Sequence, residues 1–153
     1  MKTCFFIGHR DAPLALQEQL DEVVEKLAST NNVTHFIVGH RGSFDHMATS
    51  AIQKAKKYHP ELCALRLIAY HPSERPAIIP ELFDNIYFPL ALAKCPRRFA
   101  IEKANQFVLS ESDVLVCLVS RSGGNSAELL RKAVRMEKAG QIQIINLANS
   151  ALF

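Results

Sequence analysis

The chain has no tryptophan, only 6 glycines among its 153 residues, and no long apolar run. Its longest uninterrupted apolar stretch is Val114–Val119, far below the roughly 20 residues that span a bilayer. The amino-terminal sequence MKTCFFIGHR lacks the apolar core and small-residue cleavage site of a secretion signal. No membrane partner is therefore expected, and the sequence predicts a cytoplasmic protein.

Strong charge and paired cysteines are also lacking. The formal net charge is +3, and the one tight basic cluster is Lys54, Lys56 and Lys57, which suits a solvated helix face. A nucleic-acid partner is therefore not expected. The 4 cysteines show no C-x-x-C spacing and are expected to be reduced thiols, as is usual in the cytoplasm.

Short apolar runs alternate with segments of helical periodicity. Strands are expected at Lys2–Ile7, His35–Val38, Ala64–Tyr70, Asp113–Val119 and Gln141–Leu147. Asp11 and Ser43 are candidate caps of the first two helices. The proline-rich stretch His71–Pro89 is predicted to be a long surface excursion, with a short extended piece at Asn85–Phe88.

This alternation predicts an α/β fold with a single Rossmann-like domain over residues 1–153. Right-handed crossovers then give a mostly parallel five-stranded sheet with helices on both faces. If the expected strands are counted along the chain, the predicted order in the sheet is 3-2-1-4-5.

Two of the expected strands, Lys2–Ile7 and His35–Val38, are followed by the same tripeptide, Gly-His-Arg. A third, Asp113–Val119, leads to the pair Gly123-Gly124. Ligands of such sheets bind beyond the carboxyl ends of the strands, where the strand order reverses. Glycines allow close approach of the backbone, a following helix offers free amides to a phosphate, and arginine adds charged hydrogen bonds. The sequence therefore predicts an anion site, with ordinary turn glycines as the alternative. The candidate residues are Gly8, His9, Arg10, Gly39, His40, Arg41, Gly42, Ser43, Gly123, Gly124, Asn125 and Ser126.

The segments GSFDHMATSAIQKAKKYHPEL, CPRRFAIEKANQFVLSESDVLVCLV and SGGNSAELLRKA resemble the LOG-like branch of the SLOG superfamily. The most specific parts are the G-x-x-G-x-x-D motif (Gly39, Gly42, Asp45) and the Gly123-Gly124 turn, and the resemblance covers nearly the whole chain. It implies a Rossmann-like fold that binds a nucleotide or nucleotide derivative without a further cofactor. It also implies phosphate contacts at residues 123–126 and a homodimer.

LOG enzymes cleave the N-glycosidic bond of nucleoside 5′-monophosphates, which requires a carboxylate near the sugar and a donor at the departing base. The candidate carboxylates are Glu128 and Asp45, and the candidate arginines are Arg97 and Arg98. The family arginine is missing where Ala104 stands, and Glu128 comes earlier than in the family pattern. The sequence thus predicts a nucleotide-binding protein, and it leaves open an active phosphoribohydrolase or a scaffold that has lost catalysis.

Three histidines follow strand ends: His9, His40 and His71. Neighbouring parallel strands would place them in a row, and converging imidazoles can hold a zinc ion that activates water. The sequence does not favour a metal site over two alternatives. In these, the histidines hydrogen-bond to phosphate or ribose, or they occupy polar loop positions.

Overall fold

The computed structural model describes residues 1–39, 42–70, 83–120 and 123–150. Their centre is a six-stranded sheet in the order β4-β3-β2-β1-β5-β6, and every neighbouring pair of strands is parallel. The strands are β1 (Lys2–Gly8), β2 (Val33–Val38), β3 (Cys63–Leu67), β4 (Asn85–Tyr87), β5 (Val114–Leu118) and β6 (Gln143–Asn146). The predicted α/β class with a parallel sheet is confirmed.

The predicted count of five strands is wrong. The five expected strands keep their predicted order, but β4 is added beside β3, with Leu65 opposite Asn85 and Leu67 opposite Tyr87. This segment was expected only as an extended piece within the long excursion. Three residues, with Pro89 two positions after them, carry too little alternation to predict a strand, so pairing with β3 is what makes this segment one.

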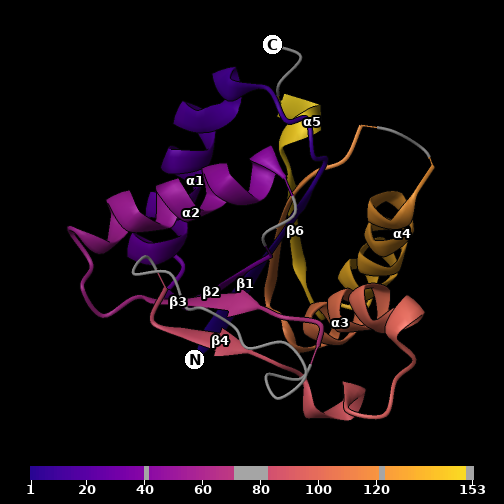
Figure 1. Cartoon of the computed structure of the whole chain (residues 1–153). Coiled ribbons are helices and arrows are strands. Elements are labelled where there is room, and N and C mark those ends of the chain that lie inside the picture. Colours follow the sequence, from indigo (N-terminus) through magenta and orange to yellow (C-terminus); the bar gives the residue numbers. More distant parts are fainter. Residues whose placement is uncertain (40–41, 71–82, 121–122, 151–153) are drawn as a thin grey trace.

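Helices cover both faces of the sheet (Figure 1). On one face lie α1 (Gln17–Ser29) and α2 (Ser43–Lys56), and on the other lie α3 (Arg97–Glu111) and α4 (Asn125–Lys138). The short helix α5 (Leu147–Ser150) follows β6. Two apolar cores result, because successive side chains of a strand point to opposite faces.

Strand β1 shows this division directly. Cys4 and Phe6 belong to the core that includes residues of α1 and α2, whereas Phe5 belongs to the core that includes residues of α3 and α4. Both phenylalanines are 1% exposed, and full burial of such a side chain contributes about 2 kcal/mol. β1 is thus anchored on both faces, and its carboxyl end is held in a defined place.

The first two helices begin differently from the expectation. A 3-10 turn over Leu14–Leu16 precedes α1, and no side chain caps it, so Asp11 is not its cap. The residue that precedes α2 is Gly42, and Ser43 is its first helical residue. The Ser43 hydroxyl instead donates to the carbonyl oxygens of Arg10 (2.7 Å) and Ala12 (3.2 Å), so it joins α2 to the loop after β1.

Burial makes two of the thiols chemically inert. Desolvation raises the pKa of Cys4 strongly and raises the pKa of Cys117 to about 12. Both thiols therefore stay protonated at neutral pH. Within the described ranges, none of the helices combines the length and the apolar character needed to cross a bilayer.

Asp84 connects the β3–β4 edge of the sheet to α2. Its carboxylate accepts hydrogen bonds from Lys56 Nζ (2.6 Å) and from the Ala64 backbone N–H (2.7 Å). Partial burial acts to raise the pKa of Asp84, but the two hydrogen bonds and the Lys56 charge outweigh burial and hold this pKa below its usual value. The carboxylate form is therefore favoured in the folded protein.

Asp84→Asn is expected to lower the free energy of unfolding at neutral pH by about 1 kcal/mol, since the side chain is half-exposed and solvent weakens the pair. Because the folded pKa is the lower one, this stabilisation is present above the unfolded pKa and is lost as the pH falls through the folded pKa. Urea denaturation of the wild type and of Asp84→Asn at about pH 7 and at about pH 2 to 3 measures this stabilisation. Lys56→Met, which removes the other partner of the ion pair, is the matched comparison. Equal losses of stability from Asp84→Asn at both pH values would contradict the lowered pKa of Asp84.

Candidate functional site

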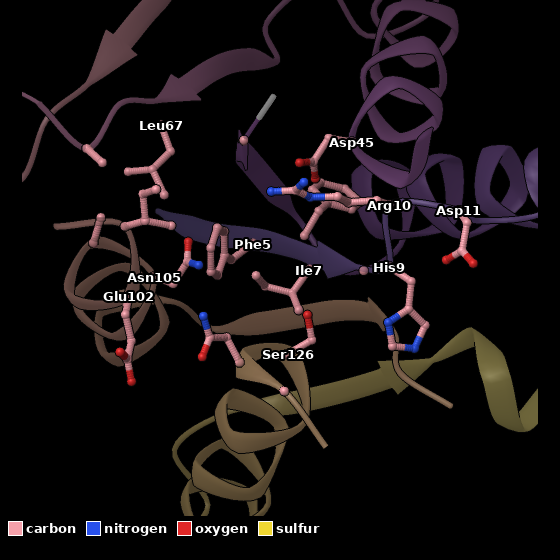
Figure 2. A pocket seen from close by; sticks show the side chains of 18 of the residues that line it. Phe5, Ile7, His9, Arg10, Asp11, Asp45, Leu67, Glu102, Asn105 and Ser126 are labelled. Carbon is pink, nitrogen blue, oxygen red and sulfur yellow. The ribbon is translucent and has the colours of Figure 1, made fainter. Parts of the chain in front are cut away.

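A cavity of about 590 Å³ opens at the carboxyl ends of the central strands (Figure 2). Its floor comes from β1 and from the ends of β2 and β3, and its walls come from the first turn of α2, from α3 and from the start of α4. The lining residues shared with the sequence prediction are Gly8, His9, Arg10, Gly39, Asp45, Arg98, Gly123, Gly124, Asn125 and Ser126. The structure thus brings together residues that are up to 118 positions apart, from Gly8 to Ser126.

Other predicted site residues do not line this cavity. Glu128 is exposed in the first turn of α4, and Ser43 is engaged with the loop after β1. The Arg97 guanidinium lies over the Tyr70 ring, 5.2 Å from its centroid. Gly42 also lies outside the wall, packed against Arg10. His40, Arg41 and His71 lie outside the described residues.

Gly8, at the end of β1, and Gly42, just before α2, allow these two parts of the chain to pack closely against each other. A Cβ atom on Gly8 would lie 2.4 Å from Phe44 Cγ, and a Cβ atom on Gly42 would lie 2.5 Å from Arg10 Cα. The backbone N–H of Ser43 also donates to the Arg10 carbonyl oxygen at 2.9 Å. The loop after β1 and the start of α2 are therefore interlocked.

The glycines at the start of α4 have open space instead. A Cβ atom on Gly123 or Gly124 would meet no atom of the described residues within 4 Å. Gly124 precedes the helix with φ of +94°, a conformation that favours glycine. The first amides of a helix lack intrahelical acceptors and lie at the positive end of the helix dipole. This turn can therefore accept an anion such as a phosphate.

One face of α3 completes the cavity with polar side chains. Arg98, Glu102 and Asn105 are spaced by four and three residues, which places them on the same helix face. Sequence reasoning missed Glu102 and Asn105 as site residues. Their spacing from Arg98 was the available signal, but it also fits an ordinary solvated stripe. Asp11 was missed because it was interpreted as a helix cap.

Charges of both signs line the described wall. Arg10 and Arg98 are cationic, whereas Asp11, Asp45 and Glu102 are carboxylates. Figure 2 shows Arg10 and Asp45 on one side of β1 and the His9 ring on the other. Such a wall can pair an anionic group of a ligand with arginine and a hydrogen-bond donor with a carboxylate.

His9 makes a contact that bears on the metal hypothesis. Its Nε2 atom accepts a hydrogen bond from the Ser120 backbone N–H at 3.0 Å, so this nitrogen lone pair is already engaged. The other two histidines of that hypothesis are not described. Among the described residues, no group of three or more histidine, cysteine, aspartate or glutamate side chains is arranged to hold a metal ion.

Comparison with protein-family models gives no match, and no curated protein matches the chain. Solved structures do match. DNA processing protein A (DprA) of Streptococcus pneumoniae has a TM-score of 0.62 and 11% identity, over 99% of this chain and 61% of that one. This chain therefore spans less than two thirds of the length of that protein.

Two further structures share the fold. The molybdenum cofactor carrier protein of Chlamydomonas reinhardtii has a TM-score of 0.61 and 13% identity, over 99% of this chain and 94% of that one. DprA of Helicobacter pylori, described for its single-stranded DNA binding mode, has a TM-score of 0.57 and 18% identity over 99% and 80% of the two chains. At these identities the likeness establishes the Rossmann-like α/β fold and nothing finer.

Proposed function

We propose that the protein binds a nucleotide or a nucleotide-derived small molecule in the cavity at the carboxyl ends of β1, β2 and β3. The observation that carries the proposal is the open Gly123-Gly124 turn, which presents the start of α4 to this cavity. The volume of about 590 Å³ falls within the usual range for small-molecule sites. The phosphate would contact the start of α4, and Arg10 or Arg98 would add charged hydrogen bonds.

The fold neighbours support ligand binding of this general kind. One is a carrier of a cofactor, and another binds single-stranded DNA, whereas neither description points to catalysis. We also infer that the chain is a SLOG-type protein, and its LOG-like character is part of the same proposal. The expectation against nucleic acid gains no support from these neighbours, so oligonucleotides belong among the ligands to be tested.

A thermal-shift screen of the purified protein tests the proposal. The panel contains matched pairs of nucleosides and nucleoside 5′-monophosphates, dinucleotides, ADP-ribose and short single-stranded DNA, each with and without zinc. A ligand at a hundred times its dissociation constant adds about 2.7 kcal/mol of stability, which is a readable shift. We expect a nucleotide to raise the melting temperature and its nucleoside to raise it less. Equal shifts within each pair would contradict the phosphate contact, and no shift would favour the scaffold alternative.

Hydrolysis of the N-glycosidic bond is the second candidate function. It is favoured by the carboxylates of Asp45 and Glu102 in the cavity wall, whereas Glu128 lies outside that wall. Release of free base from the same nucleotide panel would reveal the activity. Loss of release in Asp45→Asn or Glu102→Gln, with Glu128→Gln unaffected, would assign the reacting carboxylate. Binding without base release would leave the protein a binder.

A further inference from the structure

Polar side chains from both neighbouring strands hold the chain where it leaves β5. On one side, Asn146 at the end of β6 donates from Nδ2 to the Val119 carbonyl oxygen (3.1 Å), and its Oδ1 accepts from the Val119 N–H (3.2 Å). On the other side, His9 after β1 accepts from the Ser120 N–H (3.0 Å). Side chains thus extend the hydrogen bonding of the sheet beyond its last ladder pairs.

These contacts determine the amide orientation of Asn146 and the tautomer of His9. Asn146 must place its oxygen at the Val119 N–H and its nitrogen at the Val119 carbonyl, and the same oxygen also accepts from the Ala148 N–H at 3.1 Å. His9 can accept from an N–H only through a nitrogen that carries a lone pair. A His9 ring that makes this contact is neutral, with its proton on Nδ1, because an imidazolium ring cannot accept a hydrogen bond.

In the sequence, the candidate phosphate turn follows shortly after Ser120. Ser120 precedes Gly123 by three positions, and both His9 and the residues Gly123–Ser126 line the cavity. Backbone amides bind a phosphate more tightly when they are already directed at it, so the exit of β5 bears on affinity. Figure 2 shows the His9 ring on the side of β1 that faces Ser126.

We propose that His9 and Asn146 are positioning residues that fix the exit of β5, and through it the Gly123–Ser126 turn of the ligand cavity. His9 does this as the neutral Nδ1–H tautomer. The ligand part of this inference rests on the proposed function, whereas the tautomer and the order of the turn can be tested without a ligand.

The first measurement is the tautomer of His9, read by nitrogen-15 NMR of the imidazole rings at pH 8. We expect the Nδ1–H form for His9. The ring of the exposed His46 of α2, which does not line the cavity, provides an internal comparison for the nitrogen-15 signals of His9. A His9 ring with its proton on Nε2 would overturn the inference, because such a ring cannot accept from Ser120.

The second measurement compares variants by amide hydrogen exchange and by titration with adenosine 5′-monophosphate. His9→Ala and Asn146→Ala are each expected to speed exchange at Ser120, Gly123 and Gly124. Loss of one such hydrogen bond should weaken nucleotide affinity about three- to tenfold. His9→Gln is expected to keep the slow exchange and the nucleotide affinity of the wild type, because its side-chain oxygen can reach the place of Nε2. His46→Ala should change neither the exchange nor the affinity.

Affinity as a function of pH separates positioning from a merely structural role. Because an imidazolium ring cannot accept from the Ser120 N–H, wild-type affinity is expected to fall when His9 becomes protonated at acidic pH. Among the described residues, the charged groups that share the cavity wall with His9 are Arg10 and Asp11 on its own loop, Asp45 on α2, and Arg98 and Glu102 on α3. The described end of β5 and the end of β6 carry none. These groups remain in His9→Gln, so this variant should lack the histidine part of the pH dependence.

The outcomes distinguish this inference from the proposed function. If the wild type does not bind the nucleotide but the exchange results hold, the proposed ligand is wrong and the positioning role stands. If exchange at Gly123 and Gly124 is unchanged in His9→Ala, the positioning role is wrong, whether or not the nucleotide binds. It is also wrong if His9→Ala speeds exchange while leaving a measurable affinity unchanged.

Discussion

Gly42→Ala is expected to destabilise the protein by about 3 kcal/mol, at the upper end of the usual cost of overpacking. The new Cβ atom would lie 2.5 Å from Arg10 Cα and 2.9 Å from Arg10 Cβ. The φ of Gly42 is 175°, so the cost comes from the collision and not from the backbone conformation. Arg10 has little room to retreat, because its carbonyl oxygen accepts from both the N–H and the hydroxyl of Ser43.

Thermal and urea denaturation of the variant measure this effect. Gly123→Ala is the matched control, since a Cβ atom there meets no described atom within 4 Å and the φ of Gly123 lies outside the left-handed region. We expect the control to unfold within about 1 kcal/mol of the wild type. Equal stability of Gly42→Ala and Gly123→Ala would contradict the interlocking of the start of α2 with the loop after β1.

Gly123→Asp is expected to abolish nucleotide binding without loss of stability. A carboxylate just before the start of α4 interacts favourably with the helix dipole, so the free energy of unfolding should stay equal or rise slightly. The same carboxylate would lie where the phosphate is proposed to bind. Two like charges about 4 Å apart near a protein surface repel by about 4 kcal/mol, which corresponds to a loss of affinity of at least a hundredfold.

Calorimetric titration with the best nucleotide of the thermal-shift screen, beside urea denaturation, measures both quantities. Gly123→Asn is the control, because it has nearly the same shape without the charge and should lose much less affinity. Gly124 is a poorer site for such variants, since its φ of +94° makes most side chains strained. Affinity retained in Gly123→Asp would place the phosphate elsewhere in the cavity.

Sequence reasoning succeeded where local pattern and chain topology decide the result. Short apolar runs such as Val114–Val119 favour buried strands, and their alternation with helices favours parallel pairing with right-handed crossovers. The order of the five expected strands followed from these rules. The carboxyl ends of parallel strands meet at one edge, so the sequence predicts that Gly8, Gly39 and Gly123 lie close together, and all three line the cavity.

Contacts between distant residues decided the rest. β4 exists because its three residues pair with β3 beside the Asp84 contacts, and no local alternation marks it. Glu102 faces the cavity and Glu128 does not, because the rotation of each helix about its axis is set by packing against the sheet.

The glycines show the same division. The sequence alone determined that the chain turns sharply at the ends of successive strands, because glycine after an apolar run has that local effect. The tertiary structure alone decided that Gly8 and Gly42 make room for Phe44 and Arg10, whereas Gly123 stays open to the cavity. The physical reason is that backbone freedom is a property of one residue, while the space around a residue is set by side chains that are distant along the chain.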